Sequence, residues 1–273
     1  KYGTLELAKI ENMRTQADDL AAGKHVQSTD DLDAIEESLE SGCEQGGHVV
    51  AEPEKPYGFL AVCAGEGLAA VFRDLGADGV VSGGQTMNPS TESLLEGVDK
   101  IPAETVFILP NNSNIIMAAQ QCAALTEKRV VVIPSKTVPQ GITAMMNVDF
   151  EAPDAKTLEA AMTGSLSTVS TAQITYAARN SDFDGFDIKA GDYLALMEGK
   201  LFGTDGNLDT LLENLAASAR EKEASFISLY FGEDVSEEDA QKAAAVFEQA
   251  CPEAEVAVLS GGQPVYYYII SME

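Results

Sequence analysis

Residues 105–125, TVFILPNNSNIIMAAQQCAAL, contain the unit that decides the fold. An apolar strand at 105–109 runs into a polar turn, and a helix is expected over 112–125, where Ile115, Ala119 and Cys122 recur at helical spacing. The strand is apolar on both faces, as it is in a parallel sheet that helices cover on both sides. The segment therefore predicts one strand–turn–helix unit of an α/β fold.

The same unit recurs along residues 57–150. Three further strands are predicted at 57–64, 79–82 and 129–133, with helices at 66–75 and 89–99. Alternating strands and helices predict a first lobe with a parallel sheet flanked by helices. Residues 1–56 are polar and rich in turn residues, so they are expected to form an N-terminal segment and linker with one helix at 29–41.

Residues 151–273 are less regular and predict a second α/β lobe with a mixed sheet. Helices are expected near 154–166, 208–222 and 236–250, with a hairpin near 193–202. Strands are expected near 171–179, 225–231, 256–259 and 265–270. Two lobes predict a cleft between them.

The charge balance excludes whole classes of partner. Seventeen Lys and Arg against 44 Asp and Glu leave a formal charge of −27 over 273 residues, which is unsuited to nucleic acid or an anionic membrane surface. No apolar run approaches the roughly 20 residues that span a bilayer, so no integral membrane segment and a cytoplasmic protein are expected. The four scattered cysteines are expected to be reduced, and the missing initial methionine suggests a fragment of a longer protein.

Three turns follow the predicted strands of the first lobe, where open parallel sheets bind ligands. Asn88 is expected to cap the helix after the first turn, with Pro89 at its first position. Three helix N-termini are expected to open along one edge, and their amides and hydroxyls suit a carboxylate or phosphate. The same residues could serve only to cap helices and complete turns. The candidate ligand-binding residues of the three turns are Gly83, Gly84, Gln85, Thr86, Asn88, Asn111, Asn112, Ser113, Asn114, Ser135, Lys136 and Gln140.

Metal sites find weak support in the sequence. Asn180, Asp182 and Asp184 begin like a calcium loop, but the twelfth position is Gly191 where a bidentate Glu is needed. His25, Cys43 and His48 offer three zinc ligands in a spacing that matches no common finger pattern. We assign no metal site.

Four motifs in order carry a family resemblance. They are SGGQTMNPST at 82–91, LPNNSNIIMAA at 109–119, IPSKTVPQG at 133–141 and SGGQP at 260–264, the last followed by Tyr266, Tyr268 and IIS at 269–271. Together they closely resemble the C-terminal part of the bacterial dihydroxyacetone-kinase-like protein that is the ATP-binding subunit of fatty acid kinase. The resemblance adds Gly261 and Gly262 of the last motif to the candidate ligand-binding residues.

The resemblance implies a DegV-like (EDD) fold and a place in lipid metabolism and phospholipid synthesis. In that family a separate kinase domain holds ATP and Mg²⁺, so no cofactor is expected in these residues. The implied partner is a DegV-like fatty-acid-binding subunit that presents the acyl carboxylate, and the full-length protein is expected to be a homodimer. Fatty-acid-binding relatives carry a histidine in their last loop, whereas the histidines here are His25 and His48. No catalytic residue is assigned.

Three functions remain open at this stage. The leading hypothesis is a non-catalytic module that docks the fatty-acid-binding partner or supports dimerisation. The second is a fatty-acid-binding domain that holds the carboxylate with Thr86, Asn112 and Ser113. The third is an enzyme that uses the cleft between the lobes, for which no activating base is apparent near a Ser or Cys.

Overall fold

The structure, a computed structural model, describes residues 50–83, 88–183 and 186–273. The helix predicted at 29–41 and the zinc candidates His25, Cys43 and His48 lie outside these residues.

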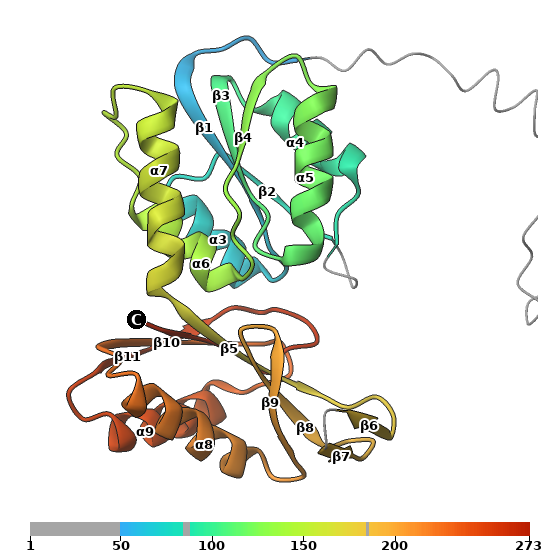
Figure 1. Ribbon diagram of the computed structural model, residues 1–273, viewed down its shortest axis with the longest axis vertical. Helices are drawn as coiled ribbons and strands as arrows, with labels where there is room; N and C mark the ends of the chain where they lie inside the picture. Colours follow the sequence, from blue (N-terminus) through green and yellow to red (C-terminus); the bar gives the residue numbers. More distant parts are fainter. Residues whose placement is uncertain (1–49, 84–87, 184–185) are drawn as a thin grey trace, which may run out of the picture. The chain divides into compact units, whose positions relative to one another are not determined.

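The first sheet is parallel throughout and has the strand order β2-β1-β3-β4 (Figure 1). Its strands are β1 (Lys55–Val62), β2 (Gly79–Val81), β3 (Ala103–Leu109) and β4 (Arg129–Val132). The predicted parallel sheet is confirmed. The order reverses direction between β1 and β3, so the switch point that suits ligand binding lies at the carboxyl ends of these two strands.

Helices cover both faces of this sheet (Figure 1). They are α3 (Glu66–Asp74), α4 (Thr91–Lys100), α5 (Ser113–Leu125), α6 (Val138–Met146) and α7 (Ala155–Ser165), the last followed by a 3₁₀ turn at Leu166–Thr168. Alternate residues of the strands serve the two faces: Leu60 and Ile108 pack with α4 and α5, whereas Phe59 and Phe107 pack on the side of α3, α6 and α7. This two-sided burial explains why the strands are apolar at every position.

Helix α7 belongs to the core of the first sheet. Its residues Leu158 and Met162 are buried in the same cluster as Phe59 and Phe107, although they follow the sequence boundary drawn at residue 150. The amphipathic pattern of α7 identifies a helix but does not say which sheet it covers.

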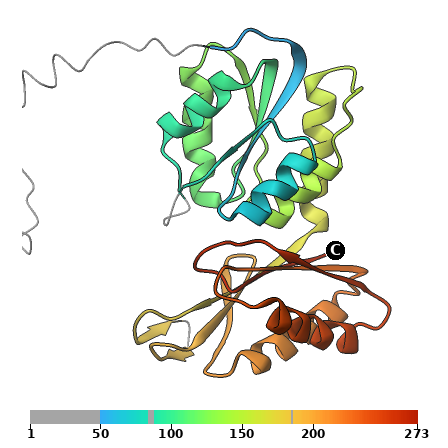
Figure 2. The ribbon, with the colours of Figure 1, turned by 180° about the vertical axis from the view of Figure 1, so that it is seen from behind.

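The second sheet is mixed, as predicted, with the order β11-β10-β12-β5-β8-β9. Strands β10 and β11 are parallel and the other neighbours antiparallel. Helices α8 (Leu208–Glu221) and α9 (Glu237–Ala250) cover one face of it (Figure 2). The strands are β5 (Ser170–Tyr176), β8 (Tyr193–Met197), β9 (Lys200–Asp205), β10 (Phe226–Phe231), β11 (Glu255–Ser260) and β12 (Tyr268–Met272).

Two details of the second lobe differ from expectation. A short hairpin of β6 (Ser181–Phe183) and β7 (Phe186–Ile188) was not predicted. The strand predicted from Val265 begins only at Tyr268, because Pro264 has no N–H to donate and the Tyr266 N–H bonds to the Pro264 carbonyl in a tight turn.

The two lobes share a core. Tyr230 of β10 and Ile269 of β12 are buried in the cluster that contains α3 and α6 of the first lobe. In the described ranges no helix has the length and apolarity that crossing a membrane requires.

Candidate functional site

The turn after β2 is described only in part. Gly84, Gln85 and Thr86 lie outside the described residues, while Gly83 and the exposed Asn88 flank them. Asn88 is not the helix cap. Ser90 is the cap, since its Oγ accepts a hydrogen bond from the Ser93 N–H at 3.1 Å and α4 begins at Thr91. A serine two residues closer to the helix is as good a cap as asparagine, so the predicted cap at Asn88 is wrong.

The turn after β3 is built around the buried Asn111. Its Nδ2 donates to the Val62 carbonyl at 2.9 Å, and its Oδ1 accepts from the Ser135 Oγ at 2.8 Å. Its backbone N–H donates to the same Ser135 Oγ at 3.1 Å, and its φ of +55° lies in the left-handed region that asparagine tolerates. Asn111 therefore ties together the carboxyl ends of β1, β3 and β4 at the switch point.

This network leaves no room beside Asn111. A Cβ on Gly141, in α6, would overlap the Asn111 side chain. The Asn111 and Ser135 side chains, both predicted as ligand contacts, thus spend these polar groups on the fold. Asn112 caps α5 by accepting from the Asn114 N–H at 3.0 Å.

The turn after β4 joins the two lobes. Thr137 caps α6, and its Oγ1 lies 2.8 Å from the Oγ1 of Thr171 in β5. The buried Gln140 accepts from the Lys136 N–H at 2.8 Å and donates to the Leu166 carbonyl at 3.3 Å. The amide of Gln140 is thereby engaged inside the fold, whereas the Lys136 side chain is exposed.

A cavity of about 390 Å³ lies where these turns meet the second sheet. The first lobe lines it with Asn88, Asn111, Asn112, Ser113, Asn114, Lys136, Thr137 and Val138. The second lobe lines it with Gln173, Leu196, Glu198, Gly199, Val265, Tyr266 and Ile269. Six predicted site residues are therefore gathered at one cavity, each from one of the three turns, as the geometry of a parallel sheet requires.

Gly261 and Gly262 lie elsewhere, against the start of α3. The Gly261 carbonyl accepts from the Leu68 N–H at 3.1 Å, and a Cβ on Gly67 would overlap the carbonyl oxygen of Ser260. The last loop thus packs backbone to backbone on the turn after β1 and closes it. Sequence reasoning overlooked this fourth turn, although Gly65 and Gly67 on either side of Glu66 were a signal for close approach.

The residues that the second lobe adds to the cavity were also missed. Glu198 and Gly199 form the two-residue turn between β8 and β9, with φ of +51° and +75° as a type I′ hairpin needs. The Glu198 Oε1 accepts from the Thr171 N–H at 2.5 Å, which fixes this turn against β5. A Glu-Gly pair between two apolar runs signals the hairpin, but not the lobe that it faces.

Val265 is strained at the cavity wall. Its φ is +71°, and the Tyr266 N–H donates to the Pro264 carbonyl at 2.8 Å around it, which is the geometry of the rare classic γ-turn. The Thr175 Oγ1 supports the turn by donating to the Val265 carbonyl at 2.9 Å. A β-branched residue in this conformation costs about 1–3 kcal/mol.

Two opposite charges line the cavity. The Lys136 ammonium and the Glu198 carboxylate form no ion pair with any residue of the described ranges. Groups of three or more potential metal ligands are absent from those ranges, and Asp184 of the rejected calcium loop lies outside them. The cavity therefore offers amide, hydroxyl, ammonium and carboxylate groups to a polar occupant.

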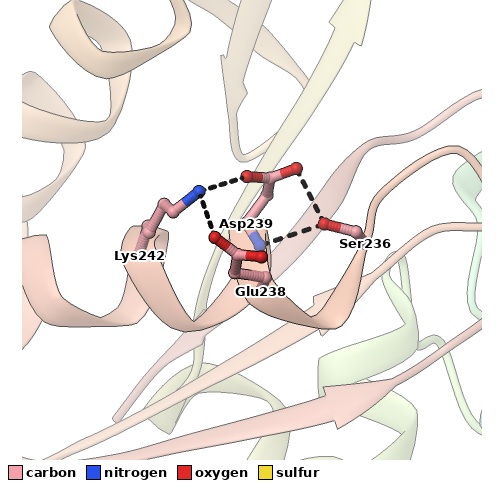
Figure 3. Close-up of polar contacts among 4 residues, drawn as sticks. All are labelled: Ser236, Glu238, Asp239 and Lys242. Atoms are coloured by element: carbon pink, nitrogen blue, oxygen red, sulfur yellow. Dashed lines mark hydrogen bonds and ion pairs between the residues drawn. The ribbon is translucent and has the colours of Figure 1, made fainter.

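The most acidic helix start of the second lobe is satisfied within the protein (Figure 3). Ser236 caps α9 by accepting from the Asp239 N–H at 3.2 Å, and Lys242 pairs with both Glu238 and Asp239 at 3.0 and 2.9 Å. Hydrogen bonds from Lys242 and Ser236 lower the pKa of Asp239. Capping and local pairing account for this cluster without a ligand.

Comparison with known proteins follows the same order of residues. The sequence model of the FakA-like C-terminal family, which covers the C-terminal part of fatty acid kinase proteins, matches residues 58–273. The Bacillus subtilis (strain 168) protein YloV is 39% identical over all of this chain and 46% of its own length. An uncharacterized protein of Staphylococcus aureus (strain USA300) is 31% identical, again over 100% of this chain and 46% of its own length. The chain thus spans about half the length of these curated relatives.

Solved structures show the fold. The DegV family protein Cg2579 of Corynebacterium glutamicum has a TM-score of 0.55 at 15% identity, covering 80% of this chain and 96% of its own. DegV of Bacillus subtilis, a fatty acid binding protein, has a TM-score of 0.54 at 11% identity, covering 80% of this chain and 99% of its own. The fold is therefore DegV-like, as expected from the four motifs.

Proposed function

The chain belongs to the FakA-like C-terminal family of fatty acid kinase proteins, and on that premise we propose that it is the non-catalytic C-terminal module of a fatty acid kinase. In this role it docks the fatty-acid-binding partner, so that a separate kinase domain reaches the acyl carboxylate. ATP and Mg²⁺ would be held by that domain.

The family match carries the proposal. It spans residues 58–273, whereas more than half the length of the curated relatives lies outside the region they share with this chain. A kinase domain in that remaining part would supply the phosphoryl transfer, and a module with the fold of an acyl carrier would hold the carrier itself.

The chemistry of the two lobes supports a role without catalysis. Both histidines precede residue 50. Burial raises the pKa of the Cys63 thiol to about 12 and that of Cys122 to about 11, so both remain protonated and poorly nucleophilic at neutral pH.

Deletion tests this proposal. The full-length protein that lacks residues 57–273 should bind nucleotide normally but phosphorylate partner-bound fatty acid at a small fraction of the full-length rate. Pull-down with the 273-residue chain should capture the fatty-acid-binding partner. An undiminished rate without residues 57–273 would refute the role, and a normal rate with a monomer-to-dimer change would assign these residues to dimerisation instead.

A fatty-acid-binding domain in its own right is the second candidate. The polar cavity favours it, because Asn112, Ser113 and Lys136 present a cap, a hydroxyl and a cation to one space. Native mass spectrometry should then find co-purified fatty acid, and oleate should raise the melting temperature of the wild type but not of Lys136→Met. A protein without lipid that oleate does not stabilise would exclude this function.

A further inference from the structure

The strained turn at Val265 presents an apolar side chain to solvent. Val265 is 44% exposed, lines the cavity, and is held at a positive φ by the Pro264 and Thr175 hydrogen bonds. A side chain this exposed contributes little to the core, so burial inside the chain does not offset the strain. Strain of this kind is typical of sites that clamp a partner or ligand.

A second exposed apolar residue lies on the first-lobe side of the same cavity. Met117 is 69% exposed and stands one helical turn after Ser113 and Asn114, which both line the cavity. Residues three and four positions apart share a helix face, so Met117 extends the wall that these two residues begin. Methionine adapts its shape to a partner better than branched side chains do.

Charged groups complete this surface. Lys136 and Glu198 lie on the cavity wall, and neither forms an ion pair within the ranges that the structure describes. Glu198 uses Oε1 to hold Thr171, which fixes the carboxylate in position while Oε2 remains available to a cation. We call Asn114, Met117, Lys136, Glu198 and Val265 the cavity mouth.

The chemistry of the cavity mouth selects its occupant. A free fatty acid would bring its anionic head beside Glu198 and its tail against amide groups, which is unfavourable on both counts. A polypeptide loop matches better, because Asn and Gln amides pair with backbone N–H and C=O groups, and a basic side chain can meet Glu198. The formal charge of −27 favours the approach of a basic surface.

We propose that the cavity mouth is the docking surface for a loop with a basic side chain on the acyl-carrying partner. This inference rests on the proposed function and names the surface that the function uses. Val265 and Met117 are the apolar anchors on either side of the cavity, and Glu198 receives the cation. Few residues carry most of the affinity at such interfaces, so single changes here should be visible.

The test measures the dissociation constant between the 273-residue chain and the fatty-acid-loaded DegV-family protein of the same organism. Val265→Gly and Met117→Ser should each weaken binding about tenfold, the effect expected of an apolar anchor. Glu198→Gln keeps an acceptor for the Thr171 N–H but removes the charge; it should weaken binding about threefold or more and flatten its dependence on salt.

Matched controls stand elsewhere on the molecule. Leu125→Ser changes an apolar residue of the same helix with 65% exposure at its opposite end. Glu223→Gln changes another exposed glutamate with positive φ, 55°, after α8. Both controls should bind as the wild type does, and circular dichroism should show that all five variants are folded.

The outcomes separate the two levels of the argument. Wild-type binding with unchanged affinity in all three cavity-mouth variants would overturn this inference and leave the docking function standing. Loss of affinity in the controls to the same degree would overturn it as well. No measurable binding by the wild type would overturn the proposed function itself. Hydrogen exchange should show protection of residues 113–117 and 263–267 in the complex.

Discussion

Asn111 gives the sharpest test of how the carboxyl edge of the first sheet is held. Replacing it with glycine keeps the positive φ but removes the bonds to the Val62 carbonyl and the Ser135 hydroxyl. Each hydrogen bond contributes about 1 kcal/mol net, and a buried group left without its partner adds to the loss. Asn111→Gly should therefore lower the free energy of unfolding by about 2–3 kcal/mol.

Asn111→Ala separates the backbone term from the hydrogen bonds. Alanine loses the same two bonds and also carries a Cβ in the left-handed region, which adds about 1 kcal/mol. The order of stability should be wild type, then glycine, then alanine. With a shift of roughly 2–4 °C for each kcal/mol in a chain of this size, the glycine variant should melt about 5–10 °C lower and the alanine variant a few degrees lower still.

Circular dichroism at 222 nm is the assay, since the chain has no tryptophan. Asn114→Ala, at an exposed position on the same rim, is the control and should change stability by no more than about 0.5 kcal/mol. A double-mutant cycle with Ser135→Ala should give a coupling of about 0.5–3 kcal/mol, because the two side chains share a hydrogen bond. Equal stability of the glycine and alanine variants would refute the role of the backbone, and losses below about 1 kcal/mol would refute the role of the network.

Three further changes follow from the same physical arguments. Val265→Gly relieves a strained γ-turn, so it should raise the free energy of unfolding by about 1 kcal/mol or more over Val265→Ala in urea titrations, and equal midpoints would contradict the strain. Gly67→Ala drives a Cβ into backbone and should cost more than about 2 kcal/mol, whereas Gly164→Ala, with open space around it in α7, should stabilise by about 0.5–1 kcal/mol; matching melting shifts would count against the close approach. Because burial raises the folded pKa of Cys63 to about 12 and of Cys122 to about 11 from 9.0, their contribution to stability is complete below pH 9 and falls as pH rises toward 11–12; replacing Cys63 with alanine should flatten that decline, and an unchanged slope would contradict it.

The sequence predicts the first lobe well because its signals are local. Apolar strands and capped helices alternate at short range, so the parallel sheet and the meeting of Asn112 with Lys136 follow from the geometry of one repeated unit. The cap assigned to Asn88 was wrong because Asn88 and Ser90 are both good caps, and two residues decide between them.

The other half of the cavity depends on contacts that no local pattern contains. Glu198 and Val265 reach the site only through the pairing of the second sheet and its packing on α6. The use of Asn111 and Ser135 by the fold likewise depends on how close β1, β3 and β4 lie at their ends. The role of Gly261 and Gly262 in closing the turn after β1 required the two lobes to be placed against each other.

Strand β12 is last in the chain but lies between β10 and β5, in the interior of its sheet. Until these final residues emerge from the ribosome, β5, β8 and β9 on one side have no link to β10 and β11 on the other. The first lobe can fold during synthesis, whereas the second can close only after translation ends. A fusion joined at Glu273 would sit directly beside this closing step, so a tag at the opposite end of the chain is the safer choice for measuring how these lobes assemble.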